Sequence, residues 1–191
     1  MPLLLPRIYS WLPKASIAAC LLLGMASHAQ AARLGDWECL TSDLNGSEQV
    51  RQEFIQASRY ASRTFNIAPP IMVAIKRVES GRGLNPNVYN NNNNGTVDRG
   101  FYQVNTEVWL PEIRRVGGDV SVQDLHGIRQ NALIAAWILR RQMNRSDVQG
   151  SLEAVAYYHK GGGASARANQ IRQRYKDLFM RELRVLISRC G

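Results

Sequence analysis

A single glutamate near the middle of the chain has the sequence setting of an acid catalyst. Glu79 ends an apolar helical stretch that begins near Ile71, and Ser80 and Gly81 follow it directly. The negative end of a helix dipole and apolar neighbours both disfavour an ionised carboxylate, so the group tends to keep its proton. A protonated carboxyl group can act as a general acid. Taken alone, however, such a glutamate is an ordinary surface residue, so the assignment depends on what accompanies it.

Two further blocks of sequence supply groups that suit a sugar substrate. Residues 100–105 read GFYQVN, and the amide of Gln103 can both donate to and accept from a sugar hydroxyl or N-acetyl group. Residues 156–162 read AYYHKGG, where Tyr157 or Tyr158 places a phenol beside a glycine loop. The structural alternatives are a buried hairpin with one satisfied glutamine and an amphipathic helix with core tyrosines. Together with the Glu79 segment, these two blocks make three, and the three in combination favour cleavage of a sugar chain.

The elements that must position these blocks are mostly helices. Apolar residues recur at helical spacing, and proline, glycine and asparagine separate the periodic segments. We expect helices over 47–65, from Pro69 to about residue 80, from a cap at Thr106 to Gly117, from Ser121 or Asp124 to about 144, from 151 to about 161, and over 166–186. The fold class is therefore mainly α.

One polar segment interrupts the helices between Glu79 and the second block. Residues 85–98 include five consecutive asparagines, and Gly95 follows them. Such residues favour turns, so we expect a small irregular or β-hairpin region that leads into residues 100–105.

The start of the chain has the features of a secretory signal peptide. Arg7 and Lys14 give a positively charged segment before an apolar run over 15–26. Small residues then surround a cleavage point before Ala32. No later stretch is apolar enough to span a membrane. We therefore expect a signal peptide over 1–31, an extended lead-in over 32–46, one domain over 47–187, a short tail over 188–191, and a periplasmic location.

Charge and cysteine content fit an exported protein. The net charge is +9, and removal of residues 1–31 deletes Arg7 and Lys14 and no acidic residue, which leaves +7. A basic exported protein favours polyanions, which include cell-wall peptide carboxylates, anionic lipid headgroups and nucleic acid, although a solvated basic surface explains the same charge. No nucleic-acid-binding module is recognisable. Cys39 and Cys190 form an even pair, which in an oxidising compartment favours a disulfide over two free thiols.

In order and spacing, the three blocks resemble those of the soluble (Slt) type of lytic transglycosylase, a variant of the lysozyme fold. The family patterns are Glu-Ser, Gly-Leu-Met-Gln-(Ile/Val)-Asn and Ala-Tyr-Asn-Ala-Gly. This chain matches the first at Glu79-Ser80 and replaces Leu and Met of the second with Phe101 and Tyr102. In the third, Tyr158 is matched, whereas His159 and Lys160 replace asparagine and alanine. The resemblance implies an α+β lysozyme-like fold, with a helical bundle and a small hairpin region around a catalytic cleft.

Three other segments resemble one subgroup of this family. Residues 67–75, 93–100 and 109–111 are similar to the small transglycosylases that accompany type IV secretion, conjugation and type III secretion machines. That similarity implies an enzyme that opens the cell wall locally, with components of a transenvelope machine as partners.

The resemblance also implies which residues act. Glu79 would protonate the bond between N-acetylmuramic acid and N-acetylglucosamine in peptidoglycan glycan strands and then help to close a 1,6-anhydro ring. Neither a cofactor nor a metal is expected. The asparagine loop lacks the acidic residue that a calcium site needs, since Phe101 holds that position. The residues expected to bind substrate are Ser80, Tyr102, Gln103, Asn105, Tyr158 and His159.

Two alternatives stay open from the sequence. A hydrolytic lysozyme-type muramidase needs a second carboxylate, for which Asp98 is the nearest candidate, although an aspartate before Gly100 also suits a simple turn. A non-catalytic peptidoglycan-binding assembly factor is the other alternative, and the replacements at Phe101, Tyr102 and His159 are compatible with it. Retention of both Glu79 and Gln103 argues against pure binding.

Overall fold

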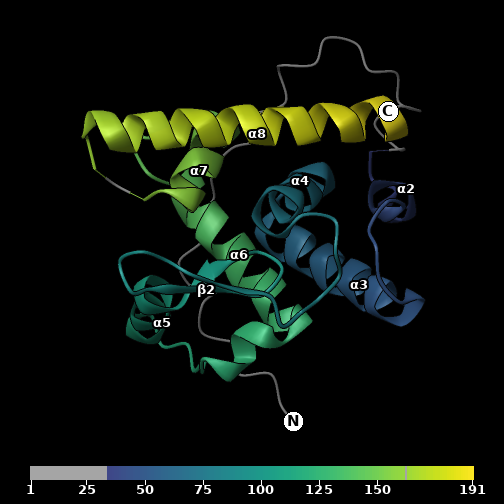
Figure 1. Cartoon of the computed structure of the whole chain (residues 1–191), viewed down its shortest axis with the longest axis horizontal. Coiled ribbons are helices and arrows are strands. Elements are labelled where there is room, and N and C mark those ends of the chain that lie inside the picture. The colour runs from purple at the N-terminus through teal and green to yellow at the C-terminus, as the bar shows by residue number, and fades with distance from the viewer. Residues whose placement is uncertain (1–33, 162) are drawn as a thin grey trace.

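Helices make up most of the residues that the computed structural model describes, which are 34–161 and 163–191 (Figure 1). In chain order the elements are α2 (Trp37–Thr41), α3 (Glu48–Phe65), α4 (Pro69–Ser80), β1 (Tyr89–Asn91), β2 (Val97–Arg99), β3 (Val104–Asn105), α5 (Thr106–Arg115), a 3-10 turn (Gln123–His126), α6 (Ile128–Met143), α7 (Gly150–His159) and α8 (Ala166–Cys190). The prediction of a mainly α fold is confirmed.

The core forms where α3 and α6 pack against each other. On α3 the side chains of Phe54, Ala57 and Ala61 are buried, and on α6 Ala132 and Leu139 are buried. These positions are three, four or seven residues apart, so each set lies on one face of its helix. The apolar stripes read from the sequence are therefore the faces that meet.

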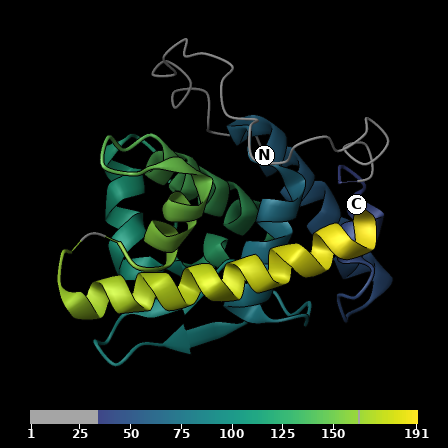
Figure 2. The same cartoon turned by 90° about the horizontal axis from the view of Figure 1, so that it is seen from above.

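The longest helix, α8, spans the width of the molecule above the others (Figures 1 and 2). It packs on α7 near its start, on α4 in its middle and on α2 near its end. Its buried side chains include Tyr175 and Phe179 at the level of α4. This arrangement brings the C-terminal helix over the helix that carries Glu79.

The polar segment folds into a three-stranded antiparallel sheet in the order β1-β2-β3. Asn90 pairs with Asp98 between the first two strands, and Arg99 pairs with Val104 between the second and third. The tight turn between β1 and β2 ends at Gly95, which has φ 81°. The expected hairpin is present, and it leads directly into residues 100–105.

Four expected element boundaries are corrected by the structure. Residues 37–41 form the short helix α2 instead of an extended lead-in, because the side chain of Asp36 caps them. Asn105, not Thr106, caps α5 by accepting a hydrogen bond from the Val108 amide. The fourth long helix starts at Ile128, since Gly127 has an extended conformation, and α8 continues to Cys190.

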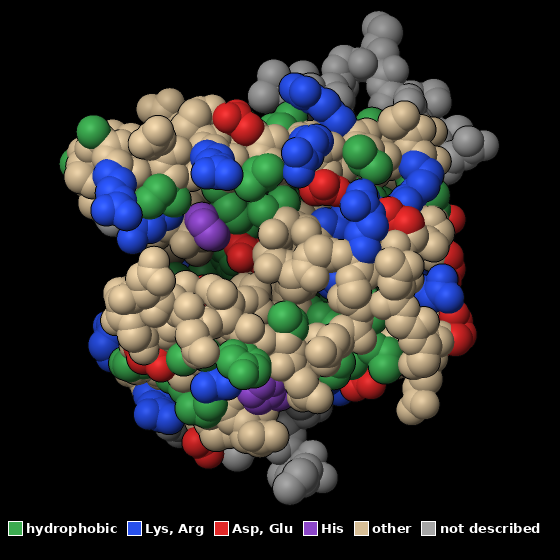
Figure 3. Space-filling view, viewed as in Figure 1, with side chains coloured by type: hydrophobic (Ala, Val, Ile, Leu, Met, Phe, Trp, Pro, Cys, Tyr) green, Lys and Arg blue, Asp and Glu red, His purple; other side chains and the backbone are tan. Residues whose placement is uncertain are grey.

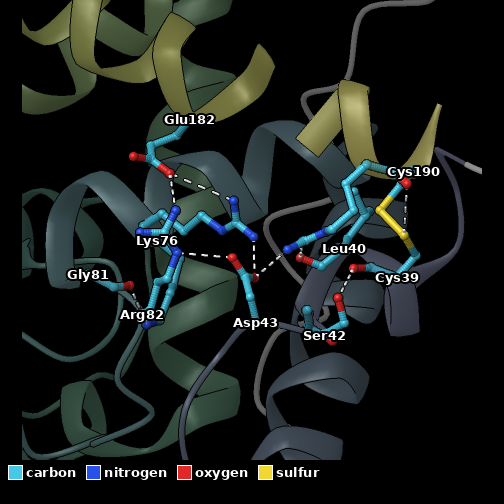
Figure 4. Close-up of polar contacts among 12 residues, drawn as sticks. Cys39, Leu40, Ser42, Asp43, Lys76, Gly81, Arg82, Glu182 and Cys190 are labelled. Atoms are coloured by element: carbon cyan, nitrogen blue, oxygen red, sulfur yellow. Dashed lines mark hydrogen bonds and ion pairs between the residues drawn. A yellow bond between two sulfur atoms is a disulfide. The ribbon is translucent and has the colours of Figure 1, made fainter. Parts of the chain in front are cut away.

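A disulfide and a charge network join α2 and the end of α8 to the end of α4 (Figure 4). Cys39 of α2 is bonded to Cys190 of α8, with their Cα atoms 5.9 Å apart. The carboxylate of Asp43 contacts the guanidinium groups of Arg77, Arg82 and Arg189, from α4, the loop after it and α8. Partial burial raises the pKa of Asp43, but these arginines more than offset that effect and lower it. The network therefore joins the end of α4 to the segment that follows α2 and to the end of α8.

The expected signal peptide, residues 1–31, lies outside the described residues. Among the helices in the described ranges, none combines the length and the apolar character that crossing a membrane requires.

Candidate active site

Glu79 lies in the last turn of α4 because of how this helix starts and stops. Pro69 and Pro70 occupy its first turn, where proline suits the backbone, and Gly81 ends it with φ 68°. The helix is buried over residues 72–77, so its end is held firmly in the core. The side chain of Glu79 is 9% exposed.

The loop after Glu79 is fixed by a buried lysine. The ammonium group of Lys76, which is fully buried, donates to the carbonyl oxygens of Gly81 and Gly83 at 2.8 and 2.7 Å. Burial lowers the pKa of Lys76 to about 8, with a further contribution from the charge of Arg77 that Asp43 opposes. Lys76 thus pairs with carbonyl groups near the helix end, and it holds the exit of the chain beside Glu79.

One oxygen of Glu79 is contacted by two aromatic side chains. The hydroxyl of Tyr175 donates to Oε1 at 2.6 Å, and Nδ1 of His159 lies 3.4 Å from the same atom. The His159 ring stacks on Tyr175, with ring centres 4.2 Å apart and planes 10° from parallel. No group in the described part of the chain forms a hydrogen bond with Oε2. The structure therefore distinguishes the two carboxylate oxygens and leaves Oε2 for a ligand.

The pKa values of both partners follow from this contact. Burial raises the pKa of Tyr175 well above its usual value, and the charge of Glu79 raises it further, so the phenol keeps its proton and donates it. For His159, burial lowers the pKa, but the hydrogen bond and charge of Glu79 and the charge of Asp98 outweigh burial and raise it. Lys160 opposes this rise.

We expect the pKa of His159 to fall in a Glu79→Gln variant, because the substitution removes the nearest negative charge. An NMR titration of the imidazole carbon-bound protons measures the change. Because the folded-state pKa is raised, the contact stabilises the fold below the unfolded pKa near 6.5, and its contribution is lost as the pH rises through the folded value. An unchanged His159 titration in the variant would show that the two side chains do not interact.

The second block is shaped around a buried asparagine of α6. Nδ2 of Asn131 donates to the carbonyl oxygens of Arg99 and Leu125, and its Oδ1 accepts from the Tyr102 amide at 2.9 Å. Gly100, with φ 74°, passes so close that a Cβ atom there would lie 2.4 Å from Nδ2 of Asn131. The side chain of Asn131 therefore fixes the turn at residues 100–103 to α6.

The expectation that Tyr102 binds substrate is wrong. Its side chain is fully buried, stacks on Phe54, and has its hydroxyl 2.8 Å from Oγ of Ser58. A phenol inside the core cannot reach a ligand in a groove. Tyr102 supports the turn from the protein interior instead.

Gln103 lies in the turn of the second block with one hydrogen bond from its side chain. It has φ 45°, unusual for a residue other than glycine, and its Nε2 donates to the Gly100 carbonyl at 2.8 Å. The side chain is only partly buried. Its amide oxygen has no hydrogen-bond donor among the described residues.

The remaining expected binding residues form bonds within the protein. Oγ of Ser80 lies 2.7 Å from the Phe101 carbonyl, and this contact joins the end of α4 to the second block. Asn105 uses its amide group to bond Asp98 and Thr96, and Tyr158 donates to the Tyr102 carbonyl at 2.7 Å. These side chains organise the site, and of the expected residues Glu79, Gln103 and His159 have the groups best placed for a ligand.

Two residues of the site were not singled out from the sequence. Tyr175 lies 96 residues after Glu79 on a helix that reads as ordinary amphipathic sequence, so no local signal marks it. Asn131 did give a signal, since it is a polar residue within the buried stripe of α6.

The space-filling view shows a groove on the face that carries these residues, with acidic and histidine side chains in it (Figure 3). A nearly buried carboxyl group with one open oxygen can transfer a proton to a bound ligand. Within the described residues, no three His, Cys, Asp or Glu side chains gather to hold a metal ion.

The mainly helical fold, in which a buried helix presents one carboxyl group beside a small antiparallel sheet, is consistent with the lysozyme-like superfamily of glycan-cleaving proteins. Within that class, residues 56–179 match the family model described as the transglycosylase SLT domain, so the chain belongs to this family of peptidoglycan lytic transglycosylases. The matched range includes Glu79, the turn at 100–103 and Tyr175. No curated protein and no solved structure matches the chain.

Proposed function

We propose that this protein cleaves the bond between N-acetylmuramic acid and N-acetylglucosamine and leaves 1,6-anhydro-muramoyl ends, with Glu79 as its acid. The observation that carries the proposal is the asymmetry of this carboxyl group. Oε1 is bonded to Tyr175 at 2.6 Å, while no described residue bonds Oε2. Oε2 is thus the oxygen available for proton transfer.

The reaction then proceeds in two proton transfers at the same oxygen. Protonated Glu79 gives its proton to the glycosidic oxygen as the bond from this oxygen to C1 of the muramoyl ring breaks. The N-acetyl group of the substrate stabilises the positive charge that develops at C1. The Glu79 carboxylate next removes the proton from the muramoyl O6 hydroxyl, and O6 bonds to C1. Glu79 is protonated again, and no water is consumed.

Tyr175 and His159 support the charged form of Glu79 between these steps. The carboxylate gains a full negative charge when it gives up its proton, and the Tyr175 hydroxyl already donates to Oε1. A donor that is in place before the charge develops stabilises it without reorganisation. Gln103, across the turn, would bind a hydroxyl or N-acetyl group of the sugar.

Hydrolysis is the second candidate reaction, and it is supported by the position of a second carboxylate, Asp98. Its two carboxylate oxygens accept from the amides of Asn105 and Asn92 at 2.6 and 2.9 Å. Its charge also raises the pKa values of His159 and Tyr158, so it acts on the same site. A second carboxylate of this kind could activate water or stabilise the sugar cation.

Product mass separates the two reactions. We expect digested peptidoglycan to yield anhydro-muropeptides, lighter by one water than the hydrolysis products, as measured by mass spectrometry. In an Asp98→Ala variant we expect the same anhydro product, with a loss far smaller than the roughly 10²–10⁴-fold that removal of a catalytic acid or base causes. The melting temperature of this variant controls for the two hydrogen bonds lost in the sheet. Reducing-end products that require Asp98 would identify a muramidase instead.

The cellular setting follows from the resemblance to transglycosylases of secretion and conjugation machines. On that basis the protein acts in the periplasm after removal of residues 1–31 and opens the wall locally for a transenvelope apparatus. Loss of assembly of such an apparatus on deletion of the gene, with rescue by the wild-type protein and not by the Glu79→Gln variant, tests this role.

A further inference from the structure

The positive charge of the described domain is concentrated on one helix. Helix α8 contains seven Lys and Arg residues and two acidic residues, a net charge of +5. The other described residues contain fourteen basic and thirteen acidic residues, a net charge of only +1. If the basic charge only served to solvate the surface, it would be distributed over all the elements. Instead, most of the net positive charge of the described residues is on α8.

Three arginines of α8 form a row on its outer surface, which we call the basic row: Arg167, Arg174 and Arg181. They are seven residues apart, close to two helical turns, so they project in similar directions about 10 Å apart. All three are exposed. The nearest carboxylate among the described residues is that of Glu182, 3.8 Å from Arg181, and no described acidic side chain pairs with Arg167 or Arg174. The row is therefore available to an outside anion.

The basic row is on the helix that borders the active-site groove, and Arg174 directly precedes Tyr175 in the sequence. Figure 3 shows Lys and Arg side chains along the surface formed by α8, above the groove. The same helix supplies Tyr175, which contacts Glu79, so α8 forms one wall of the site. Its opposite side faces the core through residues such as Phe179. A glycan strand in the groove would thus run beside the row.

Peptidoglycan supplies anions at that place. Each muramoyl residue carries a stem peptide with free carboxylates. Four or five extended residues reach roughly 13–17 Å, and a helix with its side chains is about 10–12 Å across. A stem peptide that leaves the groove on the α8 side therefore reaches the row. In the hairpin, the turn that includes Asn90 to Asn94 has neutral amide side chains and no Lys or Arg.

We propose that the basic row recognises the anionic stem peptides of the glycan strand, so that peptide-bearing peptidoglycan is the preferred substrate over glycan stripped of its peptides. The inference rests on the proposed function. Exposed ion pairs are individually weak, but several act together and are screened by salt.

The test compares two substrates and two double variants of the full mature chain. The substrates are intact peptidoglycan and the same material after an amidase has removed the peptides. Arg167→Glu with Arg174→Glu reverses two charges of the row. Arg63→Glu with Arg129→Glu, on α3 and α6, changes the net charge equally at exposed positions outside α8.

We expect the row variant to lose about tenfold in kcat/KM on intact peptidoglycan and to equal the wild type on stripped glycan. The control variant should match the wild type on both substrates. Raising the salt concentration should reduce the wild-type preference for intact material. Equal loss in the two variants, or a wild type that does not distinguish the substrates, would overturn the inference. If the inference about the basic row is overturned but the wild type still cleaves stripped glycan, the proposed function is retained. If the wild type cleaves neither substrate, the proposed function and the inference about the row are both rejected.

A sedimentation assay with vesicles containing phosphatidylglycerol tests whether the basic row binds a lipid surface instead of stem peptides. We expect no binding that depends on Arg167 and Arg174. Vesicle binding that the row variant loses, together with unchanged cleavage of intact peptidoglycan, would assign the row to a membrane surface and overturn the peptide proposal.

Discussion

Glu79→Gln is expected to lower glycan cleavage by roughly 10³–10⁴-fold, at the upper end of the effect of a general acid, while the fold is retained. Glutamine preserves the shape of the side chain. Its amide oxygen can take the place of Oε1 and accept from Tyr175, so the contact that orients the group survives. The amide has no proton that it can transfer to a leaving oxygen. Both proton transfers of the proposed reaction are therefore lost together.

The measurement is release of anhydro-muropeptides from purified peptidoglycan, with the melting temperature measured in parallel. Glu53→Gln, on the exposed surface of α3, is the matched control, and we expect it to behave as the wild type. Retained binding to insoluble peptidoglycan without cleavage would show that only the chemistry is lost. If Glu79→Gln cleaved as fast as the wild type, Glu79 would not be the acid, and if the wild type bound without cleaving, the binding-factor alternative would be correct.

Gly100→Ala is expected to cost about 3–5 kcal/mol of unfolding free energy and to disrupt the active site, among the largest effects for one added methyl group. The new Cβ atom would lie 2.4 Å from Nδ2 of Asn131 and 2.6 Å from the Leu125 carbonyl oxygen. Asn131 would have to move, and each buried hydrogen bond left unpaired costs about 1–3 kcal/mol. The positive φ of 74° adds about 1–2 kcal/mol for any residue with a side chain. Because Asn131 holds the turn that contains Gln103, activity should fall as well.

Gly95→Ala is a matched control for the backbone contribution. Gly95 also has a positive φ, 81°, but a Cβ atom there meets nothing within 4 Å. We expect a loss of only about 1–2 kcal/mol from conformation alone. Urea unfolding of both variants measures the difference, which isolates the clash with Asn131. Equal losses in the two variants would mean that Asn131 adapts without cost, and that its hydrogen bonds do not hold the turn.

The sequence alone predicted the features that depend on short-range physics. Proline at the start and glycine at the end of α4 placed Glu79 at a helix terminus, and asparagines with Gly95 predicted the hairpin. Helix stripes on α3 and α6 identified faces that are buried in the structure. Such features follow from backbone conformation and the spacing of apolar residues within about twenty positions, so they can be read without knowing the fold.

Only the tertiary structure decided which side chains meet at the site. Tyr175 and His159 approach Glu79 because α8 packs against both α4 and α7, and no pattern in the sequence specifies a contact across 96 residues. The position of Tyr102 was likewise decided by the tertiary structure, because Phe54 and Ser58 of α3 surround its side chain in the core. Helix periodicity says which face is buried, but it does not say against what. The partners of each polar group are fixed by the packing of distant helices, and so they emerge only with the fold.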